Sequence, residues 1–139
     1  DLYGTPTPVM HGDTLCSDDA PYQAFRTLCR SAEWQRQFMS RPITEREAFA
    51  KQARQESQRY TTTASNASIM DVNPSAVIDA MRSAGVRRLI HGHTHRPATH
   101  ALEIDGKPGE RIVRADWYGQ SRSLRISAQQ DPKASDSRS

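Results

Sequence analysis

The pattern of apolar and polar residues predicts two short strands that each end in a histidine-containing loop. Val9 and Met10 close an extended stretch that runs into a His-Gly-Asp turn at residues 11–13. Residues 74–85 begin with a proline, carry apolar residues at helical spacing and end at a glycine, which predicts a helix. A strand at residues 86–90 follows and ends in His-Gly-His-Thr-His at residues 91–95. This order predicts an α/β fold with its chemistry at the ends of strands.

Between the two histidine loops the periodicity becomes helical and predicts an insertion over residues 19–68. Asp18 or Asp19 can cap a first helix, and a second helical segment ends before Pro42. The capping box of Thr44 and Glu47 predicts a third helix from there to about residue 57. Short polar side chains then predict a loop at residues 60–68.

The segments around this insertion predict the core of the protein. After the second histidine loop, strands are predicted at residues 100–104, 110–115 and 123–127, the first two joined by an Asp-Gly turn. The polar residues 128–139 predict a disordered tail. Residues 1–18 and 69–127 would therefore form the core, with 19–68 inserted into it.

Composition limits what kind of protein this is. The 139 residues are 35% apolar with a mean hydropathy of -0.79, which predicts a thin core and a fragment of a larger domain. The sequence begins at Asp1 without the pattern of a signal peptide, and no apolar run approaches the roughly 20 residues of a membrane span. Two cysteines without paired spacing indicate neither a disulfide framework nor a structural zinc site, so a reducing cytoplasm fits best. The net charge of +3 favours anionic partners.

The histidines carry the strongest chemical signal. Four of the five lie in the two loops, and an extended His-x-His pair directs two imidazoles the same way, toward one metal ion or two neighbouring ions. The alternative is that each imidazole makes an ordinary hydrogen bond. His-Gly-Asp after one strand and Gly-His-Thr-His after another resemble the two C-terminal signatures of the calcineurin-like metallophosphoesterases. This resemblance implies metal ligation by His11, His93 and His95, whereas His91 and His100 are expected to support the site or the fold.

The motifs resemble those of a known family. His11-Gly-Asp-Thr-Leu-Cys16, Ile69-Met-Asp-Val-Asn73 and Leu89-Ile-His-Gly-His-Thr-His-Arg-Pro97 resemble, in order and spacing, the C-terminal half of the UDP-2,3-diacylglucosamine hydrolases, which are calcineurin-like metallophosphoesterases. The resemblance covers about residues 8–127. It implies the C-terminal half of a four-layer α/β/β/α fold with a helical lid.

The resemblance also implies an activity. In this family a centre of two Mn²⁺ ions cleaves the pyrophosphate of UDP-2,3-diacylglucosamine to UMP and 2,3-diacylglucosamine 1-phosphate (lipid X), a step of lipid A synthesis. His11 and His93 would hold one ion and His95 the other, with His93 also beside the scissile phosphate. Asp13 is expected to orient a ligand histidine or simply to form the turn. The family works at the cytoplasmic face of the inner membrane of Gram-negative bacteria as a peripheral protein.

The insertion would then be a lid over the acyl chains. Its basic residues and its apolar residues Trp34, Phe38 and Met39 suit a lipid phosphate, although a helical hairpin packed on the core would show the same pattern. Substrate contacts implied by the resemblance are Asp19, Tyr22, Arg54, Ser57 and His93.

The chain departs from the family pattern in two respects. The 139 residues lack three motifs of the family: the Asp-x-His motif, the Gly-Asp pair whose aspartate bridges the two ions, and the Gly-Asn-Arg-Asp segment. The chain alone is therefore expected to be inactive and to need an N-terminal half. The loop at residues 61–68 lacks the lysine common in the family, and Arg59 is a candidate substitute.

Three rival interpretations stay open. Another calcineurin-like phosphoesterase would show the same histidines but would act on nucleotides or other phosphoesters. The chain could also be a partial domain without function. A nucleic-acid-binding module is disfavoured, because 16 acidic residues dilute the 19 basic ones and no recognition motif accompanies them.

Overall fold

The computed structural model describes residues 1–62 and 68–115 together with 124, 126 and 127. It divides into two compact units. The sheet unit comprises Asp1–Leu15 and Pro74–Ser139, and the helical unit comprises Cys16–Asn73. The helical unit contains the predicted insertion and extends beyond it at both ends. The predicted tail, residues 128–139, lies outside the described residues.

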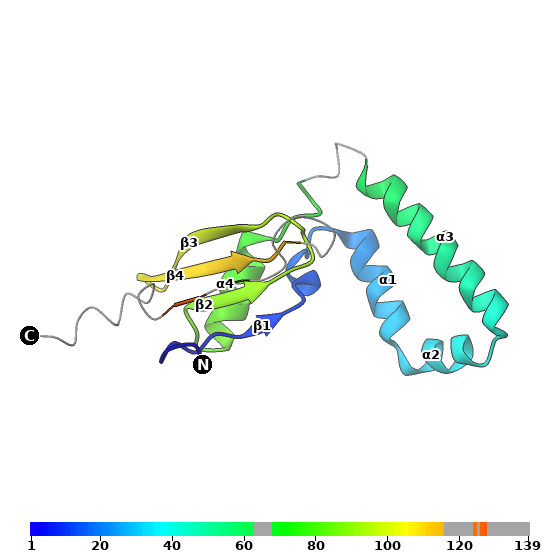
Figure 1. Ribbon diagram of the computed structural model, residues 1–139, viewed down its shortest axis with the longest axis horizontal. Helices are drawn as coiled ribbons and strands as arrows, with labels where there is room; N and C mark the ends of the chain where they lie inside the picture. Colours follow the sequence, from blue (N-terminus) through cyan, green and yellow to red (C-terminus); the bar gives the residue numbers. More distant parts are fainter. Residues whose placement is uncertain (63–67, 116–123, 125, 128–139) are drawn as a thin grey trace, which may run out of the picture. The chain divides into compact units, whose positions relative to one another are not determined.

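The sheet unit contains a four-stranded mixed sheet with the order β1-β2-β4-β3 (Figure 1). Its elements are β1 (Val9–Met10), α4 (Pro74–Ser83), β2 (Arg88–His91), β3 (Ala98–Ile104) and β4 (Lys107–Val113). Strand β2 pairs in parallel with both β1 and β4, while β3 and β4 form an antiparallel hairpin. The α/β class predicted from the sequence is thereby confirmed.

Local sequence explains these elements. Helix α4 starts at the predicted proline, and the chain leaves it through Gly85, whose φ of 64° is a left-handed conformation that glycine adopts without cost. The hairpin turns at Asp105 and Gly106, both with positive φ, as the Asp-Gly signal predicts. The strand predicted at residues 123–127 is not observed, since the described residues 124, 126 and 127 are in no strand and the others lie outside the described part.

The core of the sheet unit lies between α4 and the sheet. All four residues of β2 are buried, as expected for a central strand with parallel neighbours. Helix α4 buries Val77 and Met81, and the hairpin adds Ile104, Ile112 and Val113. Arg88 is also buried and pairs with Glu110 on the adjacent strand.

The helical unit consists of α1 (Ala20–Arg30), α2 (Ala32–Met39) and α3 (Ile43–Thr61). Asp19 caps α1 as predicted, and Ser31 caps α2. The predicted capping box is wrong, because Pro42 is the N-cap residue of α3 and Thr44 already lies inside the helix. The fixed φ of proline, here -53°, starts the helix two residues earlier than expected. The helix also ends later, at Thr61 instead of about residue 57.

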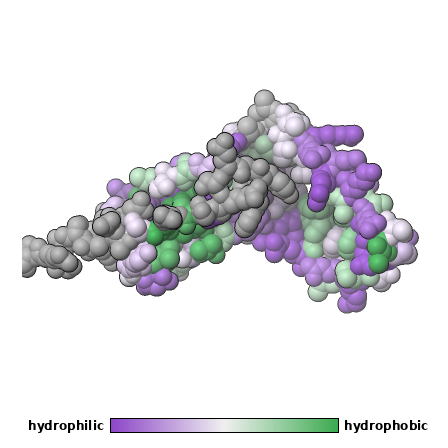
Figure 2. Space-filling model, viewed as in Figure 1, coloured by the Kyte–Doolittle hydropathy of each residue, from purple (hydrophilic) through white to green (hydrophobic). Residues whose placement is uncertain are grey.

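Aromatic rings hold α2 and α3 together. Trp34 and Phe38 stack with ring centroids 4.7 Å apart, and Phe49 of α3 contacts both, at 5.7 Å and 5.4 Å. None of the three helices contains a fully buried residue. Hydrophobic residues lie at the surface of this unit among hydrophilic ones (Figure 2), and four large side chains are exposed: Phe25, Leu28, Met39 and Ile43. Among the described residues, no helix combines the length and the hydropathy that crossing a bilayer requires.

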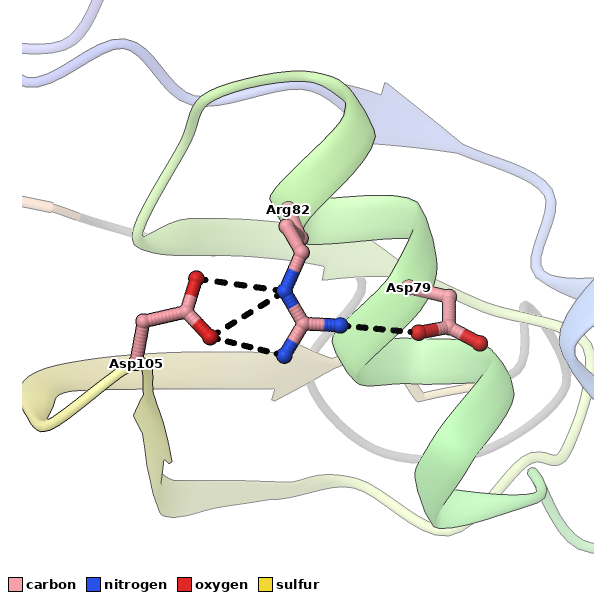
Figure 3. Close-up of polar contacts among 3 residues, drawn as sticks. All are labelled: Asp79, Arg82 and Asp105. Atoms are coloured by element: carbon pink, nitrogen blue, oxygen red, sulfur yellow. Dashed lines mark hydrogen bonds and ion pairs between the residues drawn. The ribbon is translucent and has the colours of Figure 1, made fainter.

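An ion-pair cluster fastens α4 to the hairpin turn (Figure 3). The Arg82 guanidinium donates to Asp105 from Nε at 3.1 Å and from Nη2 at 2.8 Å, while Nη1 donates to Asp79 at 3.0 Å. The hydrogen bonds from Arg82 lower the pKa of Asp105. This cluster is exposed, so its role is to orient the turn and not to form a core.

Candidate metal centre

The two histidine loops leave the same edge of the sheet. Met10, the last residue of β1, lies opposite His91, the last residue of β2, and the strands are parallel. The loops are joined directly, since the Gly92 N–H donates to the His11 carbonyl at 3.0 Å. The strand pairing therefore brings together two segments that are about 80 residues apart in the sequence.

His11 and His93 lie beside each other at this edge. Their ring centroids are 4.9 Å apart at an interplanar angle of 60°. His11 Nδ1 lies 3.3 Å from Asp13 Oδ1, and the Asp13 carboxylate is buried while the His11 side chain is 61% exposed. A carboxylate behind one ring nitrogen fixes the imidazole and directs Nε2 outward, which is the usual support of a metal-binding histidine. Of the two roles expected for Asp13, the structure favours orientation of His11.

The His-x-His segment is not extended, contrary to the expectation from its sequence. His93 and His95 have φ angles of 66° and 55°, and both are therefore left-handed. The turn is tightened by the Thr94 N–H, which donates to the Gly92 carbonyl at 2.8 Å. Backbone strain of this kind at non-glycine residues is concentrated at functional sites.

The structure brings together only part of the predicted ligand set. Within the described residues, no group of three or more His, Cys, Asp or Glu side chains is arranged to hold a metal ion. His11 and His93 are adjacent, whereas the convergence of His95 with them stays a prediction. The two imidazoles are donors that Mn²⁺ accepts, but they are fewer than a two-metal centre requires.

His91 supports both loops from inside the sheet unit. Its side chain is fully buried, and Arg111 donates to its Nε2 at 2.9 Å. Because arginine only donates, Nδ1 must carry the imidazole proton, which it donates to the Gly92 carbonyl at 2.9 Å. The ring also packs against Gly12, where an added Cβ would lie 2.7 Å from Nδ1. His91 thus has the supporting role that was expected for it.

The predicted substrate-contact residues other than His93 all lie in the helical unit. Asp19 is buried, and its Oδ1 accepts from the Tyr22 N–H at 3.2 Å and from the Tyr60 hydroxyl at 3.1 Å. Arg54 and Ser57 are exposed and lie one helical turn apart on α3. The contacts of these four residues with a substrate stay a prediction.

Sequence reasoning missed two residues that organise these regions. The polar pattern predicts a loop at Tyr60, whereas the residue lies in the last turn of α3 and donates a hydrogen bond to Asp19. Arg111 gave no signal beyond its place in a predicted strand, because its partner, His91, lies on a neighbouring strand. Strand pairing, which the sequence does not specify directly, creates that contact.

The chain is similar to curated proteins named UDP-2,3-diacylglucosamine hydrolase. It is 48% identical over 128 residues to that of Cellvibrio japonicus and 46% identical over 134 residues to that of Stenotrophomonas maltophilia. These matches cover 92% of this chain and 53% and 54% of the relatives. The protein of Bordetella pertussis is 53% identical over 107 residues, which are 77% of this chain and 41% of the relative. No protein-family model matches the chain. The resemblance predicted from the motifs is therefore confirmed: this chain is a relative of the UDP-2,3-diacylglucosamine hydrolases and spans about half the length of the curated relatives that it matches.

Proposed function

We propose that this chain supplies part of the active site of a metal-dependent UDP-2,3-diacylglucosamine hydrolase, which releases UMP and 2,3-diacylglucosamine 1-phosphate. The observation that carries the proposal is the pair of His11 and His93 at neighbouring strand ends, with the buried Asp13 carboxylate behind His11. The names and the identity of the relatives supply the substrate. The proposed fold is the C-terminal half of the four-layer metallophosphoesterase architecture.

The residues of this chain suit the binding and orientation of a phosphoryl group. His11 would bind a metal ion through Nε2, because Nδ1 faces Asp13. His93 would bind beside it and contact the scissile phosphate, and His95 would serve a second ion. A bound pair of Mn²⁺ ions would supply polarisation of the phosphoryl oxygen and a lower pKa of the attacking water. The helical unit would act as the lid, with Asp19, Tyr22, Arg54 and Ser57 on the sugar phosphate.

We propose further that the complete protein works at the cytoplasmic face of the inner membrane of a Gram-negative bacterium. A substrate with two acyl chains resides in a lipid surface, and the helical unit exposes apolar side chains such as Met39 and Ile43. The partner that completes the site would be an N-terminal half with the carboxylate ligands. We expect the 139-residue chain alone to bind Mn²⁺ weakly and to release no UMP.

The test is Mn²⁺-dependent release of UMP by the intact protein. His93→Gln should lower kcat about 100-fold or more. Asp13→Asn should weaken the affinity for Mn²⁺ about 10- to 100-fold, because it removes the negative charge that supports the His11 ring. The matched control is His100→Gln, which changes an exposed histidine on β3 and should leave both quantities unchanged. Full activity of His93→Gln would contradict the proposal.

A second assay of the same protein distinguishes the proposed lipid substrate from the rival class, nucleotides without acyl chains. A lipid enzyme should hydrolyse UDP-2,3-diacylglucosamine far faster than UDP-glucosamine without acyl chains. Equal turnover of the two would favour a phosphoesterase that acts on nucleotides.

A further inference from the structure

Two polar contacts join the beginning of the helical unit to residues near its end. Asn73, the last residue of the unit, donates from its side-chain amide to both carboxylate oxygens of Asp18 at 3.0 Å. Next to this contact in the sequence, Asp19 accepts from the hydroxyl of Tyr60 at 3.1 Å. We call Asp18, Asp19, Tyr60 and Asn73 the clasp. It joins residues separated by 55 and 41 positions in the chain.

The clasp aligns the start of α1 with the end of α3. Asp19 caps α1 through the Tyr22 N–H, so its carboxylate is fixed to that helix. Tyr60 belongs to the last turn of α3, three residues after Ser57, and is therefore on a similar side of the helix. The hydrogen bond between the two side chains consequently sets the position of one helix relative to the other within the unit.

The geometry of the Asp19 carboxylate is specific. Both hydrogen bonds that the structure gives it, from Tyr22 and from Tyr60, end on Oδ1. Within the described residues, two donors are directed to Oδ1 and no hydrogen bond ends on Oδ2, so Oδ2 is the oxygen of Asp19 that can accept a further donor. A carboxylate oxygen held in this way suits a hydroxyl or an amide N–H, and an acylated amino sugar carries both groups.

We propose that Tyr60 is a positioning residue for the substrate, which acts by orienting the Asp19 carboxylate so that Oδ2 receives a hydroxyl or amide donor of the acylated sugar. This inference rests on the proposed function and deepens it. Preorganisation of this kind strengthens binding, because the acceptor does not have to be ordered when the ligand arrives. It does not require Tyr60 to contact the substrate.

The test is a double-mutant cycle in the intact protein, read out by kcat and KM for UDP-2,3-diacylglucosamine. Tyr60→Phe should raise KM about tenfold, the equivalent of one lost hydrogen bond to a charged group, and should change kcat less than about twofold. Asp19→Asn should also raise KM. In the Asp19→Asn background, Tyr60→Phe should have no further effect on KM, because its route to the substrate is already lost. Tyr3→Phe, which removes a hydroxyl from the sheet unit, is the matched control and should behave as wild type.

Each outcome decides something different. If the effects of the two substitutions on KM are additive, or if the KM of Tyr60→Phe is unchanged, the positioning role is overturned. Hydrolysis of the substrate by the wild-type protein upholds the proposed function in either case. A kcat that falls in step with thermal stability would likewise assign Tyr60 a purely structural role and overturn the inference. Wild-type protein that does not hydrolyse the substrate would overturn the proposed function itself.

Discussion

The two units of this chain are each stabilised by different internal interactions. The sheet unit has a buried strand, a helix with a buried apolar face and a fully buried histidine that links two loops. The helical unit has no buried residue in any of its three helices and depends on one aromatic cluster and on the clasp. Rigid packing therefore supports the candidate metal ligands, whereas a few specific contacts support the helices that would bind substrate.

This difference suits the two tasks that we propose for the units. A metal centre requires imidazoles held within a fraction of an ångström, which a packed sheet edge provides. A binding surface for acyl chains has to accommodate flexible ligands, and helices with exposed apolar residues and a small core can adjust. Substitutions should therefore have large, global effects in the sheet unit and smaller, local effects in the helical unit.

The largest effect is expected at Gly12. Gly12→Ala places a Cβ 2.7 Å from Nδ1 of the buried His91, at a residue whose φ is 102°. The clash and the backbone strain together should lower the free energy of unfolding by roughly 3 kcal/mol, measured by urea denaturation. Gly4→Ala is the control, because it has a similar φ of 82° but no neighbouring atom within 4 Å. Equal losses in both variants would show that His91 is not held against the loop.

A smaller and local effect is expected at Trp34. Trp34→Ala removes the ring that stacks on Phe38 and contacts Phe49, and should cost about 2 kcal/mol, because the side chain is only half-buried. Amide hydrogen exchange should accelerate in residues 16–62 and stay unchanged in the strands of the sheet unit. Ile43→Ala, at a 63% exposed position of α3, should change exchange little. Faster exchange throughout β2 and β4 would show that the units do not differ as described.

The smallest effect is expected on the free energy of unfolding at alkaline pH, through Tyr60. Burial raises the pKa of Tyr60 above its ordinary value of 10.0, and the hydrogen bond to Asp19 and its negative charge act in the same direction. The folded protein thus holds this proton more tightly than the unfolded chain does. The resulting stabilisation is complete below about pH 10 and is lost as the pH rises through the folded-state pKa.

Unfolding titrations between about pH 8 and pH 12 measure this loss. The free energy of unfolding of Tyr60→Phe should fall less steeply than that of wild type over this range, whereas Tyr3→Phe should follow wild type. Parallel curves for wild type and Tyr60→Phe would contradict the bond to Asp19.

Much of this architecture was predictable from local signals. Pro74 and Gly85 mark the ends of α4, the Asp-Gly pair marks the hairpin, and Asp19 marks the start of α1. Such signals are local, because they depend on the backbone conformations that these residue types favour at their own positions and at adjacent ones. The convergence of His11 and His93 was expected only because both loops follow strands and match one family. The pairing of β1 with β2, which brings the two loops together, was not predicted.

Features that depend on distant partners were not predictable. The left-handed turn at His93 and His95 contradicts the extended conformation expected for this loop. It follows Gly92, whose N–H donates to the His11 carbonyl of the other histidine loop. Tyr60 and Arg111 have roles that exist only once other segments are placed beside them. The start of α3 was misplaced because two helix-initiation signals compete, and proline prevails over the capping box.

The turn that carries His93 and His95 has a consequence for the evolution of this protein. A left-handed backbone costs an ordinary residue about 1–2 kcal/mol, and glycine avoids this cost. At both positions glycine would therefore relax the fold while it deletes an imidazole. Selection for stability and selection for chemistry oppose each other at these two residues, so we expect a library of variants that is screened only for thermal resistance to accumulate glycine there.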